Sequence, residues 1–284
     1  MGVIKKLRLL LVLLVLGCNK DLSKTTGHCT SSFCSAEGAK TLVALQATPF
    51  ESIPQMDFQV QIVLLGNVLE NKWWLGSEIK TLVKHLNTAF QGSNIQFVWN
   101  EKLIRAQGFE PATIESLQED IDTYQQLIAL DKPKHINIYI LPSSGQINGS
   151  TLVLSEAFDQ YPIAGLNTVL IAESAFLNKT TLSHELGHFF GLQHTFGKKA
   201  DPYTTTELPD GSNCLESGDF ICDTPADPNE ENKRCDDSQN RLKIFKPHTD
   251  NYMSYYPSPC KKRFTQQQKE LMGKFAHNFR NYLL

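Results

Sequence analysis

The chain has 284 residues, a formal net charge of −3 and seven cysteines. Its 41% hydrophobic content includes 10% aromatic residues, which is enough to build a core and excludes a largely disordered chain. The slight excess of acidic residues argues against a general nucleic-acid-binding protein. An odd number of cysteines raises the question of whether the protein is exported.

The N-terminus has the features of an export signal. Lys5, Lys6 and Arg8 precede an apolar run of Leu and Val over residues 9–16, which is too short to span a bilayer. The following sequence, Val15-Leu16-Gly17-Cys18, resembles a bacterial lipobox. The resemblance implies that residues 1–17 are removed and that Cys18 is lipidated and anchors the protein without spanning the membrane. The alternative is an ordinary signal peptide with an incidental cysteine.

Residues 18–50 are predicted to form a flexible tether, since the first part of this segment is rich in Ser, Thr, Lys and Gly. Removing residues 1–17 takes away three basic residues and leaves a net charge of −6. Without Cys18, six cysteines remain, which is an even number that suits disulfides in an extracytoplasmic protein. Two of the six, Cys29 and Cys34, lie in the tether, and it is open whether they pair.

From about Met56 the hydrophobic pattern becomes that of a globular domain. Alternating or continuous apolar residues predict strands, and apolar residues spaced by three and four predict helices. The resulting β-α-β-α-β order indicates a mixed sheet with covering helices. The predicted strands are 58–65, 95–99, 136–141, 151–154 and 168–172, and the predicted helices are 78–90, 114–130 and 180–192.

The second half of the domain has a different composition. Eleven acidic and two basic residues lie between Asp201 and Asp237, among many Pro, Asn and Gly residues. This pattern predicts a long irregular segment held by disulfides, and by a cation, rather than by a large core. A final helix is expected after Phe264, with Thr265 as its N-cap.

The residues with the clearest chemistry are His184, Glu185 and His188 on the helix predicted over 180–192. Histidines four positions apart lie on the same helical face and can bind one Zn²⁺. Glu185 is next to the first ligand, where it can accept a proton from a zinc-bound water without binding the metal.

The pattern extends beyond the two histidines. Gly191 can take a positive φ and end the helix in a sharp turn, which returns His194 as a third ligand. Three protein ligands leave one position open for water, which is typical of a catalytic zinc. The alternative is a helix with three solvated or core histidines, but then Glu185 and Gly191 would have no reason to stand at these positions.

At this point the sequence resembles the metzincin zinc metallopeptidases, whose second signature is a Met-containing turn. Asn251-Tyr252-Met253-Ser254-Tyr255 matches it, 59 residues after His194. The resemblance implies that Met253 forms an apolar floor under the metal. It also implies that Tyr255 approaches the zinc or the oxyanion as a hydrogen-bond donor, the alternative being a tyrosine that only packs.

The resemblance narrows to the pappalysin family, also called the cytophagalysin type, through residues 181–196, Cys222-Asp223-Thr224-Pro225, the Met-turn and residues 263–267. It implies an α+β metzincin-type catalytic domain over residues 51–284. The upper subdomain, about 51–194, would hold a mixed twisted sheet with covering helices. The lower subdomain, about 195–284, would be irregular and disulfide-held, with a C-terminal helix.

The same resemblance implies further features of the lower subdomain. The disulfides would be Cys214–Cys235 and Cys222–Cys260, although the spacing alone also allows two other pairings. Ca²⁺ would bind in the acidic segment, with Asp219, Asp223 and Thr224 as candidate ligands. The alternative for these three residues is a solvated acidic loop.

The expected function is that of a bacterial cell-envelope endopeptidase that depends on zinc and cleaves extended polypeptides, with Glu185 as general base. It is expected to be a monomer that meets the membrane through its lipid anchor alone and binds no nucleic acid. Two alternatives are a zinc-stabilised surface adhesin or substrate-capture lipoprotein without turnover, and a metal-dependent hydrolase of non-peptide substrates.

Overall fold

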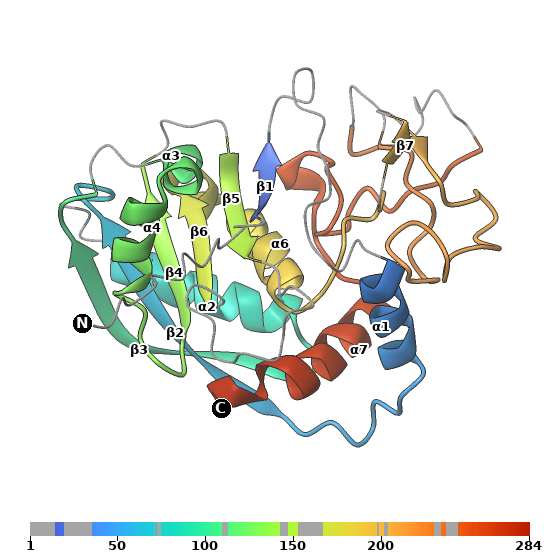
Figure 1. Ribbon diagram of the computed structural model, residues 1–284, viewed down its shortest axis with the longest axis horizontal. Helices are drawn as coiled ribbons and strands as arrows, with labels where there is room; N and C mark the ends of the chain where they lie inside the picture. Colours follow the sequence, from blue (N-terminus) through green and yellow to red (C-terminus); the bar gives the residue numbers. More distant parts are fainter. Residues whose placement is uncertain are drawn as a thin grey trace, which may run out of the picture.

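The computed structural model shows a mixed sheet, helices on both of its faces and an irregular C-terminal part (Figure 1). It describes residues 15–19, 36–70, 72, 75–109, 113–142, 147–152, 167–197, 199–201, 204–229, 234–236 and 244–284.

The sheet has the strand order β1-β5-β6-β4-β2-β3. Strands β3, β2, β4 and β6 run parallel to one another, whereas β5 is antiparallel to β6, and β1 is antiparallel to β5. The mixed sheet predicted from the sequence is therefore confirmed. The strands are β1 (Val15–Asn19), β2 (Met56–Leu65), β3 (Ile95–Ala106), β4 (Ile136–Leu141), β5 (Ile147–Leu152) and β6 (Thr168–Ala172).

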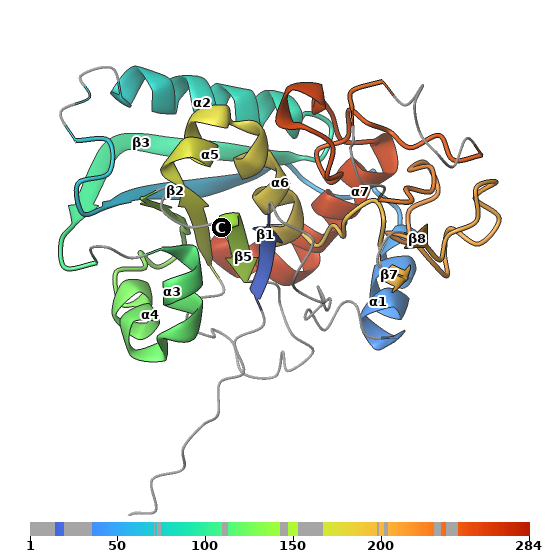
Figure 2. The same cartoon turned by 90° about the horizontal axis from the view of Figure 1, so that it is seen from above.

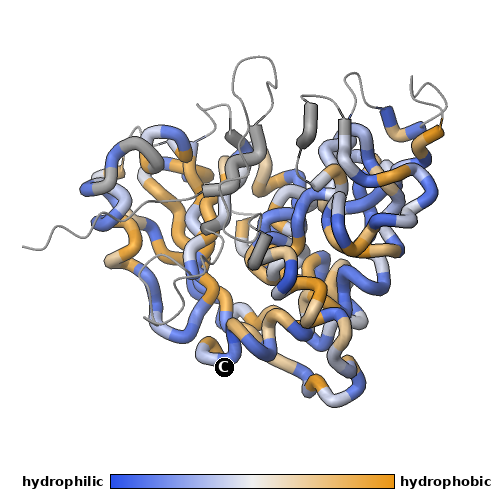
Figure 3. Tube along the Cα trace, turned by 45° about the vertical axis from the view of Figure 1, so that its right-hand side comes forward, coloured by the Kyte–Doolittle hydropathy of each residue, from blue (hydrophilic) through white to orange (hydrophobic). Residues whose placement is uncertain are grey.

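The central strands are buried on both faces because the helices cover the sheet from two sides. Along β4, Ile138 and Ile140 belong to one hydrophobic cluster, and Tyr139 and Leu141 belong to the other. This division follows from the alternation of side chains along a strand. Figure 3 shows the hydrophobic stretches concentrated in the interior and hydrophilic residues along the outer turns.

Helix α2 (Leu75–Ala89) covers one face of the sheet, and the short helices α3 (Ile114–Glu119) and α4 (Ile121–Ile128) cover the other (Figure 2). We expected one continuous helix over 114–130. Asp120 interrupts it, because its extended backbone ends α3 and its carboxylate accepts hydrogen bonds from the backbone of Asp122 and Thr123 at the start of α4.

Residues 36–46 correct the predicted tether of residues 18–50. They form helix α1 (Ala36–Gln46), which lies beside the C-terminal helix α7 (Gln266–Phe275) in Figure 1. Leu42 is fully buried, and the Lys274 ammonium donates to the Gln46 carbonyl at 2.9 Å. The tether prediction is wrong for this part because its apolar residues find a partner far along the chain.

The C-terminal part is irregular, as its composition predicted. It contains a two-stranded sheet of β7 (Lys199–Asp201) and β8 (Thr204–Thr205), a short 3₁₀ turn (Ser258–Cys260) and then α7. Thr265 caps α7 by accepting a hydrogen bond from the backbone of Gln268, which confirms its predicted role. A π-helical turn (Ala276–Arg280) and a 3₁₀ turn (Asn281–Leu283) follow.

The disulfide pairing differs from the predicted one. Cys214 is bonded to Cys222, and Cys235 is bonded to Cys260, so the predictions Cys214–Cys235 and Cys222–Cys260 are wrong. The turns between Cys214 and Cys222 fold the chain back on itself and bring their Cα atoms to 5.0 Å, a separation that suits a disulfide. The observed pairing is one of those that the spacing left open.

The N-terminal predictions are covered only in part. The backbone of Cys18 lies in β1, next to β5, while Cys29 and Cys34 lie outside the described residues. Among the residues that the structure describes, no helix is long and apolar enough to cross a membrane.

Candidate active site

The centre of the candidate site is helix α6 (Thr180–Phe189), which lies against β5 (Figures 1 and 2). Every residue of α6 from Leu182 to Phe189 is buried, so His184 and His188 both point into the protein. Gly191 ends this turn of chain with φ of +89°, as predicted. A Cβ at Gly191 would also lie 2.4 Å from the Phe275 ring. Glycine is therefore required here for two reasons, the positive φ and the lack of room for a side chain.

The turn after α6 brings His194 back to the two helical histidines. The three Nε2 atoms lie 3.0 to 3.2 Å from one another. Nitrogen ligands at about 2.1 Å around a tetrahedral zinc lie about 3.4 Å apart, which is close to this spacing. Within the described part of the chain, this is the one group of at least three His, Cys, Asp or Glu residues whose ligand atoms lie within 4.8 Å of one another.

The hydrogen bonds behind the histidines set their tautomers. His184 Nδ1 lies 2.6 Å from the Tyr252 carbonyl oxygen, and His188 Nδ1 lies 2.8 Å from that of Leu192. A carbonyl only accepts, so each Nδ1 carries the proton and donates it, which leaves the Nε2 lone pair facing the centre. Lone pairs gathered in this way suit a cation, and three neutral imidazoles are a donor set typical of Zn²⁺.

Burial keeps the two helical imidazoles, those of His184 and His188, neutral. It lowers the pKa of His184 well below its usual value and the pKa of His188 to about 4, with the neighbouring positive charge of Lys261 adding to both effects. A histidine must be neutral to bind a metal, so the two helical ligands are in the required form at neutral pH.

Glu185, the predicted general base, is completely buried next to the histidines. The Thr151 hydroxyl lies 3.2 Å from its Oε2, so β5 contacts the carboxylate directly. A buried carboxylate beside a metal site is suited to accept a proton there, because it faces little competition from bulk water.

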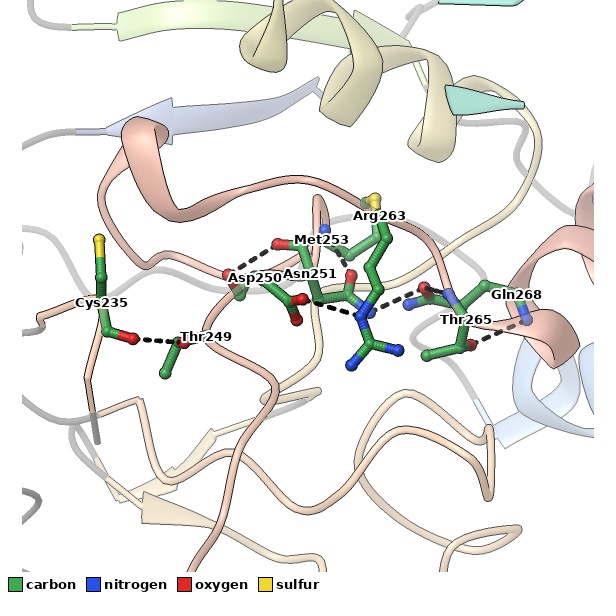
Figure 4. Close-up of polar contacts among 9 residues, drawn as sticks. Cys235, Thr249, Asp250, Asn251, Met253, Arg263, Thr265 and Gln268 are labelled. Atoms are coloured by element: carbon green, nitrogen blue, oxygen red, sulfur yellow. Dashed lines mark hydrogen bonds and ion pairs between the residues drawn. The ribbon is translucent and has the colours of Figure 1, made fainter. Parts of the chain in front are cut away.

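The Met-turn lies against α6 on the other side. Asn251 Oδ1 accepts from the Met253 backbone at 2.8 Å, and Asn251 Nδ2 donates to Gln268 at the start of α7 (Figure 4). Met253 is fully buried, and its sulfur lies 2.4 Å from where a Cβ on Gly187 would be. Met253 therefore packs on the helix between the two histidine ligands, while its role under a metal stays a prediction.

The same figure shows how the chain around the turn is held. Arg263 and Asp250 form an ion pair at 2.9 Å, and Thr249 donates to the Cys235 carbonyl (Figure 4). On the other side of the site, Thr195 donates its backbone N–H to the Met253 carbonyl. Its hydroxyl donates to the buried Asp227 carboxylate at 2.7 Å. The first of these bonds ties Thr195, the residue after His194, to the Met-turn, and the second ties it to the acidic segment.

Tyr255 lies at the edge of the site, half-buried. Its ring centroid is 4.6 Å from that of His194 and 6.2 Å from that of His184. The structure thus places it beside the histidines, and the donor role of its hydroxyl stays a prediction.

The predicted calcium ligands fall into two groups. Asp219 and Thr224 are buried together, and the Thr224 hydroxyl donates to Asp219 Oδ1 at 2.7 Å. Asp223 instead accepts from the Gln267 backbone at the start of α7. Sequence reasoning missed Glu207, which is only 2% exposed. Burial raises the pKa of Asp219, and the nearby charge of Glu207 raises it further. The position of Glu207 in a segment full of acidic residues gave no signal of burial.

Comparisons with known proteins agree with this geometry. The model of the Peptidase_M43 family, described as pregnancy-associated plasma protein-A, matches residues 119–277, which is more than half of the chain. An extracellular metalloprotease of Sordaria macrospora is 25% identical over 274 residues, covering 92% of this chain and 85% of the relative. Human pappalysin-1 is 26% identical over 175 residues, covering 56% of this chain and 10% of its own length.

Among solved structures, a mutant form of promirolysin from Tannerella forsythia has the same fold. It aligns with a TM-score of 0.59 at 16% sequence identity and covers 87% of this chain and 88% of its own. This likeness supports the metzincin-type α+β fold.

Proposed function

The chain belongs to the Peptidase_M43 family and is a zinc metalloendopeptidase, and we propose that it acts outside the cytoplasm on extended polypeptides, with Glu185 as general base. The observation that carries the proposal is the convergence of three Nε2 atoms within 3.2 Å beside a fully buried glutamate. The relatives named above support the location, since one is an extracellular metalloprotease.

His184, His188 and His194 would hold a zinc ion, which when bound would supply a Lewis acid to polarise the scissile carbonyl and to lower the pKa of a water. Glu185 takes a proton from the attacking water and then passes it to the leaving amine, so that the carboxylate is regenerated in each cycle. The hydrogen bonds to the Tyr252 and Leu192 carbonyls keep His184 and His188 in orientation throughout.

The substrate is proposed to bind as an extended strand along β5. This strand is antiparallel to β6, and on its other side it pairs with residues of β1 from Val15 to Asn19. Removal of residues 1–17 would take away three of the five residues of β1 and leave backbone groups of β5 available to a polypeptide. Backbone pairing of this kind holds the scissile bond in place and depends little on side chains.

The N-terminal sequence supports a lipid anchor on Cys18, because the apolar run of residues 9–16 ends in a lipobox-like sequence. We place the enzyme on the surface of a bacterial cell envelope on this ground. Acylation at Cys18 would keep the catalytic domain close to the membrane and leave its substrates outside the cell.

One experiment tests location and activity together. Bacterial cells producing the full chain are fractionated, and each fraction is incubated with casein, with and without a chelator. Mass spectrometry of the products should show internal cleavage by the membrane fraction, lost on chelation and restored by zinc. Absence of cleavage in every fraction would contradict the endopeptidase, whereas activity only in the soluble fraction would contradict the anchor alone.

Tyr255 is proposed to donate its hydroxyl to the negative charge that develops on the scissile carbonyl oxygen, since its ring lies beside His194. The Tyr255→Phe variant should lose about 10- to 100-fold in kcat with little change in KM, because the donor acts mainly in the transition state. Steady-state kinetics on a fluorogenic peptide measures both constants. The neighbouring Tyr256→Phe variant is the control, and equal kcat values in the two variants would exclude the role.

Calcium is proposed to bind between Glu207 and Asp219, which are 2% and 1% exposed. Both carboxylate oxygens of Glu207 and Oδ2 of Asp219 lack a hydrogen-bond partner among the described residues. Burial raises the pKa of Glu207 to about 8, with a further contribution from the negative charge of Asp227, and burial also raises the pKa of Asp219. A hard divalent cation would neutralise this cluster and supply the missing partner.

The pKa of Glu207 predicts how stability depends on pH without calcium. The unfolded carboxyl loses its proton near 4.5 and the folded one near 8, so the free energy of unfolding should fall as the pH rises between these values. Calcium should raise Tm most at the upper end of this range, because it then binds the ionised form. Calorimetry of the zinc-loaded protein, with and without added calcium, measures both effects.

The matched variants are Glu207→Gln and Glu216→Gln, since Glu216 is exposed in the same segment. The first should remove most of the calcium-dependent rise in Tm, and the second should keep it. A calcium effect of the same size in Glu207→Gln would place the cation elsewhere.

A further inference from the structure

Strand β5 passes directly over the general base. The Thr151 side chain is completely buried, and its Oγ1 lies 3.2 Å from Oε2 of Glu185 and 3.2 Å from its backbone carbonyl oxygen. The hydroxyl has one proton, and the two acceptors found for it among the described residues both belong to Glu185. Donation to the ionised carboxylate is the stronger of the two, since charge-assisted hydrogen bonds exceed neutral ones.

Gly149 contacts the same carboxylate two residues earlier. A Cβ at this position would lie 2.6 Å from Oε1, 2.8 Å from Cγ and 2.9 Å from Cδ of Glu185. The backbone of β5 therefore approaches the carboxylate more closely than any other residue type would allow.

Residues 149 and 151 point to the same face of β5, because side chains alternate along a strand. This face lies against α6, so one strand borders both oxygens of the carboxylate: Gly149 at Oε1 and Thr151 at Oε2. A carboxylate bordered in this way has little freedom to rotate. Restricting it matters for a proton transfer, whose rate depends on the distance and direction between donor and acceptor.

We propose that Thr151 is a positioning residue for Glu185, holding Oε2 so that the carboxylate is oriented to exchange protons with the attacking water and the leaving amine. The inference rests on the proposed role of Glu185 as general base. Strand β5 then has two roles: it aligns the substrate, as proposed above, and it orients the general base Glu185.

Three variants of Thr151 separate the effect of the hydroxyl from that of the side-chain volume. Thr151→Val and Thr151→Ala lack the hydroxyl, and Thr151→Ser keeps it at nearly the size of alanine. The Val and Ala variants should lose about 10-fold in kcat, because without the hydrogen bond the carboxylate is less well oriented for proton transfer and the barrier of the chemical step rises. KM should stay within about twofold of the wild-type value. Thr151→Ser should keep kcat within about threefold. Thr168→Val, a buried threonine of β6, is the control and should keep kcat.

Zinc content is measured on the same proteins and should be unchanged within error between Thr151→Ser and Thr151→Ala. Tm should be lower in Thr151→Ala by about 3–10 °C, because the lost hydrogen bond also stabilises the fold, and both proteins should be fully folded at the assay temperature. Equal kcat values for these two variants would overturn the proposal, and so would a loss of zinc or of Tm that accounts for the loss of activity. If the wild type itself cleaves no peptide, the proposed function fails instead. If Thr151→Val does not fold, the Ser and Ala pair still decides the matter.

Discussion

The Glu185→Gln variant is expected to bind one zinc per chain and to lose at least about 10³-fold in kcat. The amide has nearly the shape of the carboxylate but cannot accept a proton, so it removes general base catalysis and leaves the histidines intact. Because Glu185 is fully buried, a solvent-exposed side chain cannot easily take its place as the base. Peptide hydrolysis and zinc analysis of the same preparation measure the two quantities.

The control for this variant is Glu101→Gln, which changes an exposed glutamate paired with Lys80 at 2.9 Å. It should keep both zinc and kcat, since exposed ion pairs contribute little. If Glu185→Gln kept more than a tenth of the wild-type kcat with full zinc, another group would have to be the base. If it lost the zinc as well, Glu185 would instead be needed for the metal site itself.

The His188→Ala variant is expected to lose both activity and the stabilisation that zinc provides. Three imidazoles converge on one point, and two remaining ligands would bind the metal far more weakly. Zinc at 100 times its Kd stabilises the wild type by about 2.7 kcal/mol. For a chain of this size that corresponds to a rise in Tm of about 5–10 °C. Calorimetry with and without zinc should show this rise in the wild type and little of it in the variant.

The His277→Ala variant is the control, because this histidine is exposed on the turn after α7. It should respond to zinc as the wild type does. A rise in Tm of wild-type size in His188→Ala would mean that zinc binds elsewhere, and the three-histidine site would then be the wrong assignment.

Strands and site residues whose patterns involve only residues close together in the chain could be predicted from the sequence. The short and mostly apolar segments of β4 and β6 predicted the observed bounds, 136–141 and 168–172. The zinc site was also predictable, because two of its ligands lie one helical turn apart and the third follows a glycine that ends the helix. In each case the chemistry depends on residues close together in the chain.

Features that depend on distant partners could not be predicted in this way. Helix α1 is stabilised by burial of Leu42 and by Lys274, more than 200 residues away. The contacts of Gly149 and Thr151 with Glu185 appear only when β5 is laid across α6. Nothing in the sequence around these residues distinguishes them from other small residues of a strand.

The disulfides illustrate the same limit. The four cysteines of the C-terminal part allow three pairings, and the resemblance to a family favoured a pairing that the structure does not have. The observed one depends on turns between Cys214 and Cys222 that the sequence indicated only as an irregular segment.

The most direct test of the central claim is a zinc titration of the metal-free protein, followed by the rate of peptide hydrolysis. Three histidines that converge on one point predict that the rate rises linearly and reaches its plateau at one zinc per chain. The Glu185→Gln variant should bind the same single equivalent and stay inactive. Full hydrolysis in the metal-free wild type, or a plateau that the His188→Ala variant reaches equally well, would contradict the account.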